Sequence, residues 1–207
     1  MTERVLTKAI AEQFRENPDS IDLRDFEAIE DAAAEALGKY KGSININSIS
    51  TLSEFAARAL AAHKGDLYLG LTTLSDAAAE ALAMHEGHLS LDFVTTLPEG
   101  AAKALAKRTD TLWLQALPEL SDKAAVALAT HTGDLFLDGL ETLSDAAAEA
   151  LAKHSGGVLS LSRLAQLENK LKKAGRLSDS VEKLIAIHHM HCDDEGEEDE
   201  EEGWSFE

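Results

Sequence analysis

Closely spaced pairs of apolar residues recur along most of the chain at a nearly constant interval. Each pair encloses one variable residue, and successive pairs begin 22 to 24 residues apart. Alternation of apolar and variable residues predicts a short β-strand whose apolar side chains share one face. The seven pairs are Ile21/Leu23, Ile44/Ile46, Leu67/Leu69, Leu89/Leu91, Leu112/Leu114, Leu135/Leu137 and Leu159/Leu161.

The stretch after each of the first six pairs is rich in alanine and predicts a helix. A serine that can accept a backbone N–H precedes most of these stretches, and an acidic residue at the first helical position suits the positive end of the helix dipole. Glycine, which enters the left-handed conformation without strain, ends most of them. The expected cap serines are Ser53, Ser75, Ser121 and Ser144, with Pro98 in this place once, and Asp110 once replaces the terminal glycine.

One strand and one helix cannot enclose a core, so we expect the units to stack on one another. Strands that are joined through a helix within one sheet are parallel, and their connections are right-handed. The sequence therefore predicts an α/β fold, a right-handed solenoid with a parallel β-sheet on its concave face and short Ala-rich helices on its convex face.

The ends of the chain depart from this pattern. Residues 1–18 carry a helical stripe of apolar side chains, which predicts an N-terminal capping helix. We expect about six units of 22–24 residues over 19–165. An insertion at 167–176 delays the next Leu-Ser-Asp signal, so residues 166–192 predict a C-terminal helical cap, followed by an acidic tail at 193–207.

The repeated pattern resembles bacterial leucine-rich repeats of the kind abundant in planctomycete-type genomes. The resemblance is clearest in LYLGLTTLSDAAAEALAMHEG (67–87) and LFLDGLETLSDAAAEALAKHSG (135–156), and it covers about 19–165. The chain lacks the asparagine that commonly follows the strand in such repeats, so its turn must be held differently. The resemblance implies a protein-binding scaffold, and it carries no shared catalytic residue. No catalytic or phosphate-binding motif is recognisable either, so we expect neither an enzyme nor a cofactor.

The charge of the chain limits its partners. The 207 residues include 38 acidic and 19 basic side chains, giving a formal net charge of -19. Ten of the acids lie in 193–207, which holds no base, so subtracting them leaves -9 for residues 1–192. Such a chain repels nucleic-acid phosphates. It has no apolar run near the ~20 residues of a membrane span, no recognisable secretory signal and one cysteine, Cys192. We therefore expect a cytoplasmic protein that binds neither nucleic acid nor membrane.

A surface for a protein partner is predicted on the sheet. If Leu67 and Leu69 face the core, the alternating positions face outward, and three of the few aromatic residues fall there. Acidic residues surround these rings, so we expect the surface to bind a basic protein or peptide. A second interpretation is that the rings only pack against one another over the sheet. The predicted contact residues are Tyr68, Trp113, Phe136, Asp66, Asp92, Gln115, Asp134 and Asp138, and the same register turns Ser90 and Ser160 outward.

Histidines offer two further candidates. His63, His85, His131 and His154 occupy one repeat position, which Tyr40 and Arg108 share. This column is either a metal or proton-relay ladder or, as we favour, a set of helix-end side chains that donate to backbone carbonyls. Near the end of the chain, His188, His191 and Cys192 are metal ligands by type. Their run is either a metal-sensing site or the end of the last helix.

The acidic tail leaves two interpretations open. It either only aids solubility, or it acts as an inhibitor or immunity-type element that binds a cationic protein. Trp204 and Phe206 lie at its end, and a tail that served only for solubility would not need them.

Overall fold

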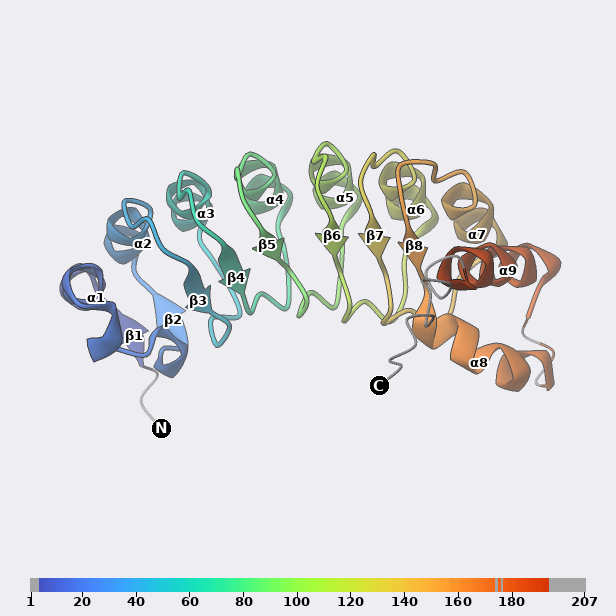
Figure 1. The fold of residues 1–207 in the computed structure, drawn as a ribbon, viewed down its shortest axis with the longest axis horizontal. Coiled ribbons are helices and arrows are strands. Elements are labelled where there is room, and N and C mark those ends of the chain that lie inside the picture. Colours follow the sequence, from blue (N-terminus) through green and yellow to red (C-terminus); the bar gives the residue numbers. More distant parts are fainter. Residues whose placement is uncertain (1–3, 174, 176, 194–207) are drawn as a thin grey trace, which may run out of the picture.

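The fold is an α/β arrangement in which short helices alternate with the strands of one parallel sheet. The computed structural model describes residues 4–173, 175 and 177–193, with side chains as far as His188 in the last helix. Figure 1 shows the units side by side in a gently curved row, with the helices in one layer and the strands in another. The six strands follow the order of the sequence and are β3 (Ile44–Ile46), β4 (Leu67–Leu69), β5 (Leu89–Ser90), β6 (Leu112–Trp113), β7 (Leu135–Phe136) and β8 (Leu159–Ser160).

Helices precede and separate these strands as the alanine-rich stretches predicted. Four of them begin at a serine whose Oγ accepts the backbone N–H three residues later, and Ser53 does so at 2.9 Å from Ala56 N. Alanine brings little bulk, so each helix packs closely on its neighbours. The helices are α2 (Asp31–Leu37), α3 (Glu54–Ala61), α4 (Asp76–Leu82), α5 (Glu99–Leu105), α6 (Asp122–Leu128) and α7 (Asp145–Leu151).

The helix α5 has no serine at its start and is capped from the preceding helix instead. Pro98 occupies the cap position, and the Asp76 Oδ1 accepts the Ala101 backbone N–H at 2.8 Å. Gly100 makes room for this contact, because a Cβ at Gly100 would lie 2.2 Å from the Asp76 Oδ2. One carboxylate therefore links two consecutive units and replaces the missing hydroxyl.

One continuous hydrophobic core lies between the two layers. The leucines and isoleucines of β3 to β8 are buried, and so are the alanines and leucines on the inner sides of the helices. Burying such side chains contributes about 25 cal/mol per Å² of apolar surface removed from water. The core runs through all the units, which explains why no unit needs to be stable alone.

The N-terminal segment differs from the expectation. The pair Ile21/Leu23 forms no strand, because η1 (Pro18–Ser20) and η2 (Leu23–Asp25), two 3₁₀ turns, occupy this region. The Asp22 Oδ1 accepts the Arg24 backbone N–H at 3.0 Å, and this local hydrogen bond competes with strand pairing. The prediction of a first strand here was therefore wrong.

A second, smaller sheet forms at this end. In it β1 (Val5–Leu6) pairs in parallel with β2 (Ala28–Ile29), each just before a helix. The helix α1 (Lys8–Glu16) carries buried Ala11 and Phe14, which lie 23 residues before their equivalents in α2. The N-terminal cap is therefore built like the helical half of a repeat.

Two helices close the other end. The helix α8 (Ser162–Lys173) includes most of the insertion and lies largely within the helical cap predicted over 166–192, but it begins inside the range 19–165 that was assigned to repeats. The helix α9 (Asp179–Asp193) follows the last Leu-Ser-Asp signal, and its Val181, Leu184 and Ile185 are buried. It packs against α7 and β8, while η2 lies beside β3. Both outer strands of the sheet are therefore covered, which removes open edges that could pair with another chain.

Within the described residues, no helix combines the length and the apolar character that crossing a membrane requires.

Candidate functional site

One row of outward-facing positions crosses the four middle strands of the sheet, β4 to β7. Backbone pairing aligns Tyr68 with Ser90, Ser90 with Trp113, and Trp113 with Phe136. The three aromatic side chains are half-buried, while the leucines beside them on each strand point into the core. This is the register that the sequence predicted. We call Tyr68, Ser90, Trp113 and Phe136 the central row.

The rings of the central row contact one another and their neighbours. Trp113 and Phe136 stack with ring centroids 4.0 Å apart and planes within 10° of parallel. Tyr68 lies against His88, with centroids 5.2 Å apart and planes tilted by 49°. The contact between Trp113 and Phe136 agrees with the interpretation that the aromatics pack over the sheet. Because both rings stay partly exposed, it leaves their surface available to a partner.

Two serines expected on the surface are buried instead. Ser90 is 3% exposed and Ser160 is 7% exposed. Each is a small side chain beside a large ring: Ser90 pairs with Tyr68 and Trp113, and Ser160 pairs with Phe136. Each hydroxyl also donates to a carboxylate at 2.5 Å, to Asp92 and Asp138 respectively. The prediction of exposure was wrong because it considered the direction of the side chain and not the size of its neighbours.

The acidic residues near the central row are held in place. The Asp134 Oδ1 accepts the Val158 backbone N–H at 2.9 Å. The Asp138 Oδ1 accepts the Ser162 backbone N–H at 3.0 Å as well as the Ser160 hydroxyl. These carboxylates therefore stabilise the pairing of β7 with β8, in addition to any role toward a partner. Asp66 accepts more weakly from the Ser43 hydroxyl at 3.4 Å, and Gln115 is exposed beyond β6.

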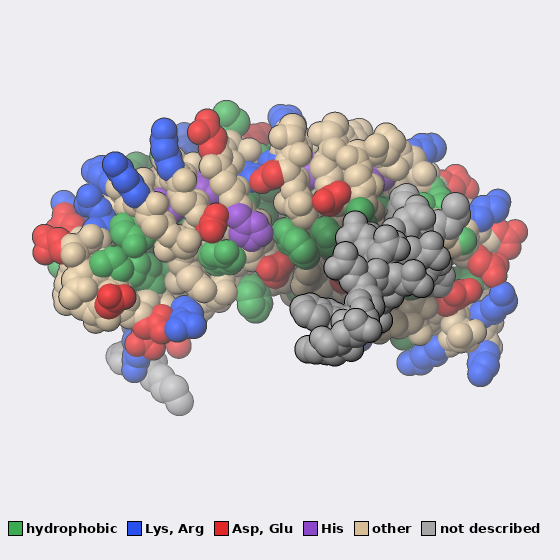
Figure 2. Space-filling view, in the orientation of Figure 1, with side chains coloured by type: hydrophobic (Ala, Val, Ile, Leu, Met, Phe, Trp, Pro, Cys, Tyr) green, Lys and Arg blue, Asp and Glu red, His purple; other side chains and the backbone are tan. Residues whose placement is uncertain are grey.

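The outward positions of the sheet strands combine acids with aromatic rings and carry no Lys or Arg from Ser43 to Ser162. Figure 2 shows acidic side chains beside hydrophobic ones over the middle strands, whereas most Lys and Arg side chains lie toward the ends or over the helices. Fixed carboxylates without a nearby Lys or Arg on the outward positions give this face a negative potential.

The histidine column lies inside the molecule, near the ends of the helices. His63 and His131 are each 1% exposed, and His85 is also buried. The rings of His63 and His85 stack with centroids 6.2 Å apart, and those of His131 and His154 stack at 6.3 Å. The His63 Nδ1 lies 2.8 Å from the Tyr40 carbonyl oxygen, which belongs to the preceding unit. This contact is the helix-end hydrogen bond that the sequence predicted.

Burial lowers the pKa of two histidines in the column, His85 and His154. Loss of hydration lowers the pKa of His85, and repulsion from Arg108 and His63 lowers it further. Loss of hydration also lowers the pKa of His154, and the neighbouring His131 adds to this effect. Both side chains are therefore held in the neutral form at neutral pH.

Arg108 occupies a position of the column where most units have histidine, and Asp110, two residues later, compensates its charge. Its guanidinium is buried and donates to the carbonyl oxygens of His85 and Gly87, each at 2.9 Å. The Nε donates to the Asp110 Oδ1 at 2.9 Å, and the Nη2 pairs with the Asp110 Oδ2. Asp110 stands where the neighbouring units have Gly87 and Gly133. A permanently charged arginine can therefore be buried in the column because the Asp110 carboxylate pairs with it.

His188 belongs to the same column, which the sequence analysis missed. It follows Ser178 by the ten residues that separate His154 from Ser144, but the insertion at 167–176 hides this spacing. Its side chain is buried, and the Nδ1 lies 3.3 Å from both the Leu161 backbone N and the Leu159 carbonyl oxygen. The structure thus places His188 against β8.

The predicted metal ligands are only partly described. The side chains of His191 and Cys192 lie outside the described residues, as do Trp204, Phe206 and nearly all of the acidic tail. Within the part of the chain that the structure describes, no group of three or more His, Cys, Asp or Glu side chains could hold a metal ion. The metal site therefore stays a prediction, and His188 is already engaged with the backbone of β8.

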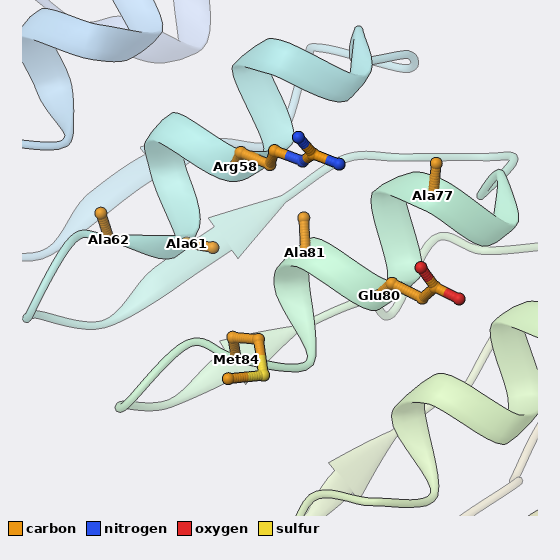
Figure 3. Close-up of a pocket in the computed structure, with 7 residues that line it drawn as sticks. All are labelled: Arg58, Ala61, Ala62, Ala77, Glu80, Ala81 and Met84. Atoms are coloured by element: carbon orange, nitrogen blue, oxygen red, sulfur yellow. The ribbon is translucent and has the colours of Figure 1, made fainter.

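A shallow groove also runs along the helix layer. Figure 3 shows it between α3 and α4, with a floor of alanine side chains and with Arg58, Glu80 and Met84 around it. Met84 is 77% exposed. The lining of the groove combines one cation, Arg58, and one carboxylate, Glu80, with apolar side chains.

Comparisons of the chain with protein-family models, with curated proteins and with solved structures find no match.

Proposed function

We propose that the protein is a non-enzymatic scaffold that binds a basic protein or peptide through the outward face of its six-stranded sheet. The observation that carries this proposal is the stack of Trp113 on Phe136 in the middle of an outward face that has acids and no Lys or Arg. Aromatic anchors surrounded by polar groups are typical of the energetically important part of protein interfaces.

We propose that the protein has the architecture of a bacterial leucine-rich-repeat solenoid. The spacing of 22 to 24 residues, the parallel order of β3 to β8 and the separate layer of alanine-rich helices support this assignment. In such a solenoid the sheet forms the concave face and the connections are right-handed. A concave sheet surrounds a partner on more than one side, so the buried area per partner residue rises.

The size of the aromatic anchors is sufficient for specific binding. A partner that covered the exposed part of one large ring would remove on the order of 100 Å² of apolar surface from water. At about 25 cal/mol per Å², this contributes about 2.5 kcal/mol before the entropic cost of association. Removal of Trp113 is therefore expected to weaken binding by at least about tenfold, since each 1.4 kcal/mol is a factor of ten.

The test compares three proteins as baits in a lysate of the source cells: wild type, Trp113→Ala and Met84→Ala. Met84 is an exposed apolar residue on the helix layer, so its variant controls for non-specific adhesion. We expect mass spectrometry to recover one basic protein with wild type and Met84→Ala, and at least tenfold less with Trp113→Ala. Equal recovery with all three baits would contradict the proposed site. Thermal unfolding of each bait shows whether the variant is folded.

A further inference from the structure

We propose that the side chain which the central row recognises in its partner is an arginine, in preference to a lysine. This inference rests on the proposed function and names the chemistry of its site. It follows from the arrangement of two kinds of group: an aromatic stack, and two carboxylates that lie just before and just after the strand carrying Phe136.

Each ring of the stack covers one face of the other, so a planar cation can lie only on the second face of a ring, which is turned toward the small neighbour Ser90 for Trp113 and Ser160 for Phe136. The Trp113 and Phe136 rings lie within 10° of parallel, and both remain partly exposed. A cation over an aromatic face is attracted by the ring quadrupole, and tryptophan binds it best. A guanidinium is flat and weakly hydrated, so it stacks on such a ring, whereas an ammonium keeps its tightly bound water.

The carboxylates lie within reach of a group on the stack. Asp134 lies just before β7 and Asp138 lies in the turn just after it, each two residues from Phe136, so the backbone of Asp134 is about 7 Å along the strand from Phe136. Both acids therefore flank the ring on the outward face. The Asp138 Oδ1 already accepts two hydrogen bonds, whereas among the described residues the Asp134 Oδ1 accepts only the one from Val158 N. An arginine can therefore place its donors on the Asp134 carboxylate in a bidentate manner while its plane lies on a ring, and a lysine cannot do both.

The site is already ordered without a partner. Hydrogen bonds from Val158 N and Ser162 N hold the Oδ1 atoms of Asp134 and Asp138, and the stack restricts Trp113. A preformed arrangement loses less conformational entropy on binding. A competing cation is absent from the same face, because its outward positions contain no Lys or Arg.

The experiment measures two labelled nonapeptides by fluorescence anisotropy at physiological salt. Their sequences, (Gly-Ser-Arg)₃ and (Gly-Ser-Lys)₃, carry the same charge. The full chain is used, and binding to the acids of 193–207 is measured separately in the Trp113→Leu chain, which has the same tail, and is subtracted for each peptide. We expect wild type to bind the arginine peptide about fivefold to tenfold more tightly than the lysine peptide, as a cation–π contact combined with a bidentate pair implies.

Substitutions in the central row test whether the preference for arginine arises there. Trp113→Leu and Phe136→Leu are each expected to reduce the ratio to about one, while Met84→Ala leaves it unchanged. Circular dichroism shows whether each variant is folded. If one of the two leucine variants does not fold, the other still tests the site. Asp134→Asn keeps an acceptor for Val158 N but loses the charge, so it is expected to weaken the arginine peptide more than the lysine peptide.

Two results would overturn the inference. One is equal binding of the two peptides, and the other is an arginine preference that persists in both leucine variants, which would place it on another part of the chain. If equal binding occurs while capture of the cellular partner still depends on Trp113, the inference fails and the proposed function stands. If capture is also independent of Trp113, both fail.

Discussion

The start of α5 offers a sharp test of how the units are joined, because one carboxylate there replaces a missing cap. In Asp76→Ala the Ala101 backbone N–H loses the acceptor that now lies 2.8 Å away. Loss of an N-cap costs about 1–2 kcal/mol. Loss of the negative charge at the first position of α4 adds about 0.3–1 kcal/mol. We therefore expect a decrease of about 1.3–3 kcal/mol in the free energy of unfolding, measured by urea denaturation.

A matched variant separates these two contributions. Asp122 holds the equivalent position in α6, but its carboxylate accepts from the Ser144 hydroxyl, and Ser144 still caps Ala147 N at 3.0 Å. Asp122→Ala thus loses the charge and keeps the cap. It is expected to cost only about 0.3–1 kcal/mol.

A second substitution should restore the cap. The backbone of Pro98, with φ -60 and ψ 156, closely matches that of the capping Ser53, with φ -67 and ψ 159. Serine at 98 can therefore accept the Ala101 N–H itself. We expect Pro98→Ser to recover about 1 kcal/mol in the Asp76→Ala protein and almost nothing in wild type. Equal losses in Asp76→Ala and Asp122→Ala, together with no recovery by Pro98→Ser, would refute this account of the junction.

Two further predictions concern the histidine column. Arg108→His alone removes the buried donors to the carbonyl oxygens of His85 and Gly87 and leaves the exposed Asp110 without its cation, so it should destabilise the protein by about 1–3 kcal/mol in urea denaturation. Arg108→His with Asp110→Gly restores the residues of the neighbouring units and should recover most of this loss, so additive losses would contradict the pairing. Because burial lowers the pKa of His85 and His154, their neutral forms stabilise the fold fully above the unfolded pKa of about 6.5, and this contribution decreases as the pH falls below it. The unfolding free energy should therefore fall by up to about 1.4 kcal/mol per pH unit for each ring. Replacing both rings with tyrosine, which occupies the column at Tyr40, should flatten this dependence, and an unchanged pH profile would show that the rings do not titrate with unfolding.

Much of the fold was predictable because the repeat spacing fixes it. The apolar pairs gave β3 to β8, and the 23-residue step from Leu112 to Leu135 was enough to place Trp113 beside Phe136. The serine caps were also predictable, since a hydroxyl at the start of an alanine-rich stretch has one obvious acceptor role.

Other features depend on contacts that a single segment does not encode. The burial of Ser90 depends on rings from two other strands, Tyr68 and Trp113. The 3₁₀ turn at Leu23–Asp25 forms because Asp22 offers a local acceptor, although the apolar pair there matches the strand pattern. The junction of Asp76 with Ala101 joins residues from two units, so neither unit shows it alone.

The two ends were harder to place because the spacing breaks there. Phe14 stands where the later units have leucine, so α1 did not look like part of the repeat. The insertion at 167–176 shifted His188 out of the column in a comparison by sequence. The pairing of Arg108 with Asp110 was hidden for a different reason. In the sequence, Arg108 and Asp110 depart from the repeat at two separate positions, and the structure shows that the Asp110 carboxylate pairs with the Arg108 guanidinium.

The most direct test of the central claim follows the emission of Trp113 while the partner recovered by the capture experiment is added. Trp204→Phe leaves Trp113 as the single tryptophan of the chain. A partner that covers the sheet face must change the surroundings of the half-buried indole, so the account predicts a saturable shift of the emission to shorter wavelength. Binding seen by calorimetry at the same concentrations without any change in Trp113 emission would place the partner elsewhere and contradict the account.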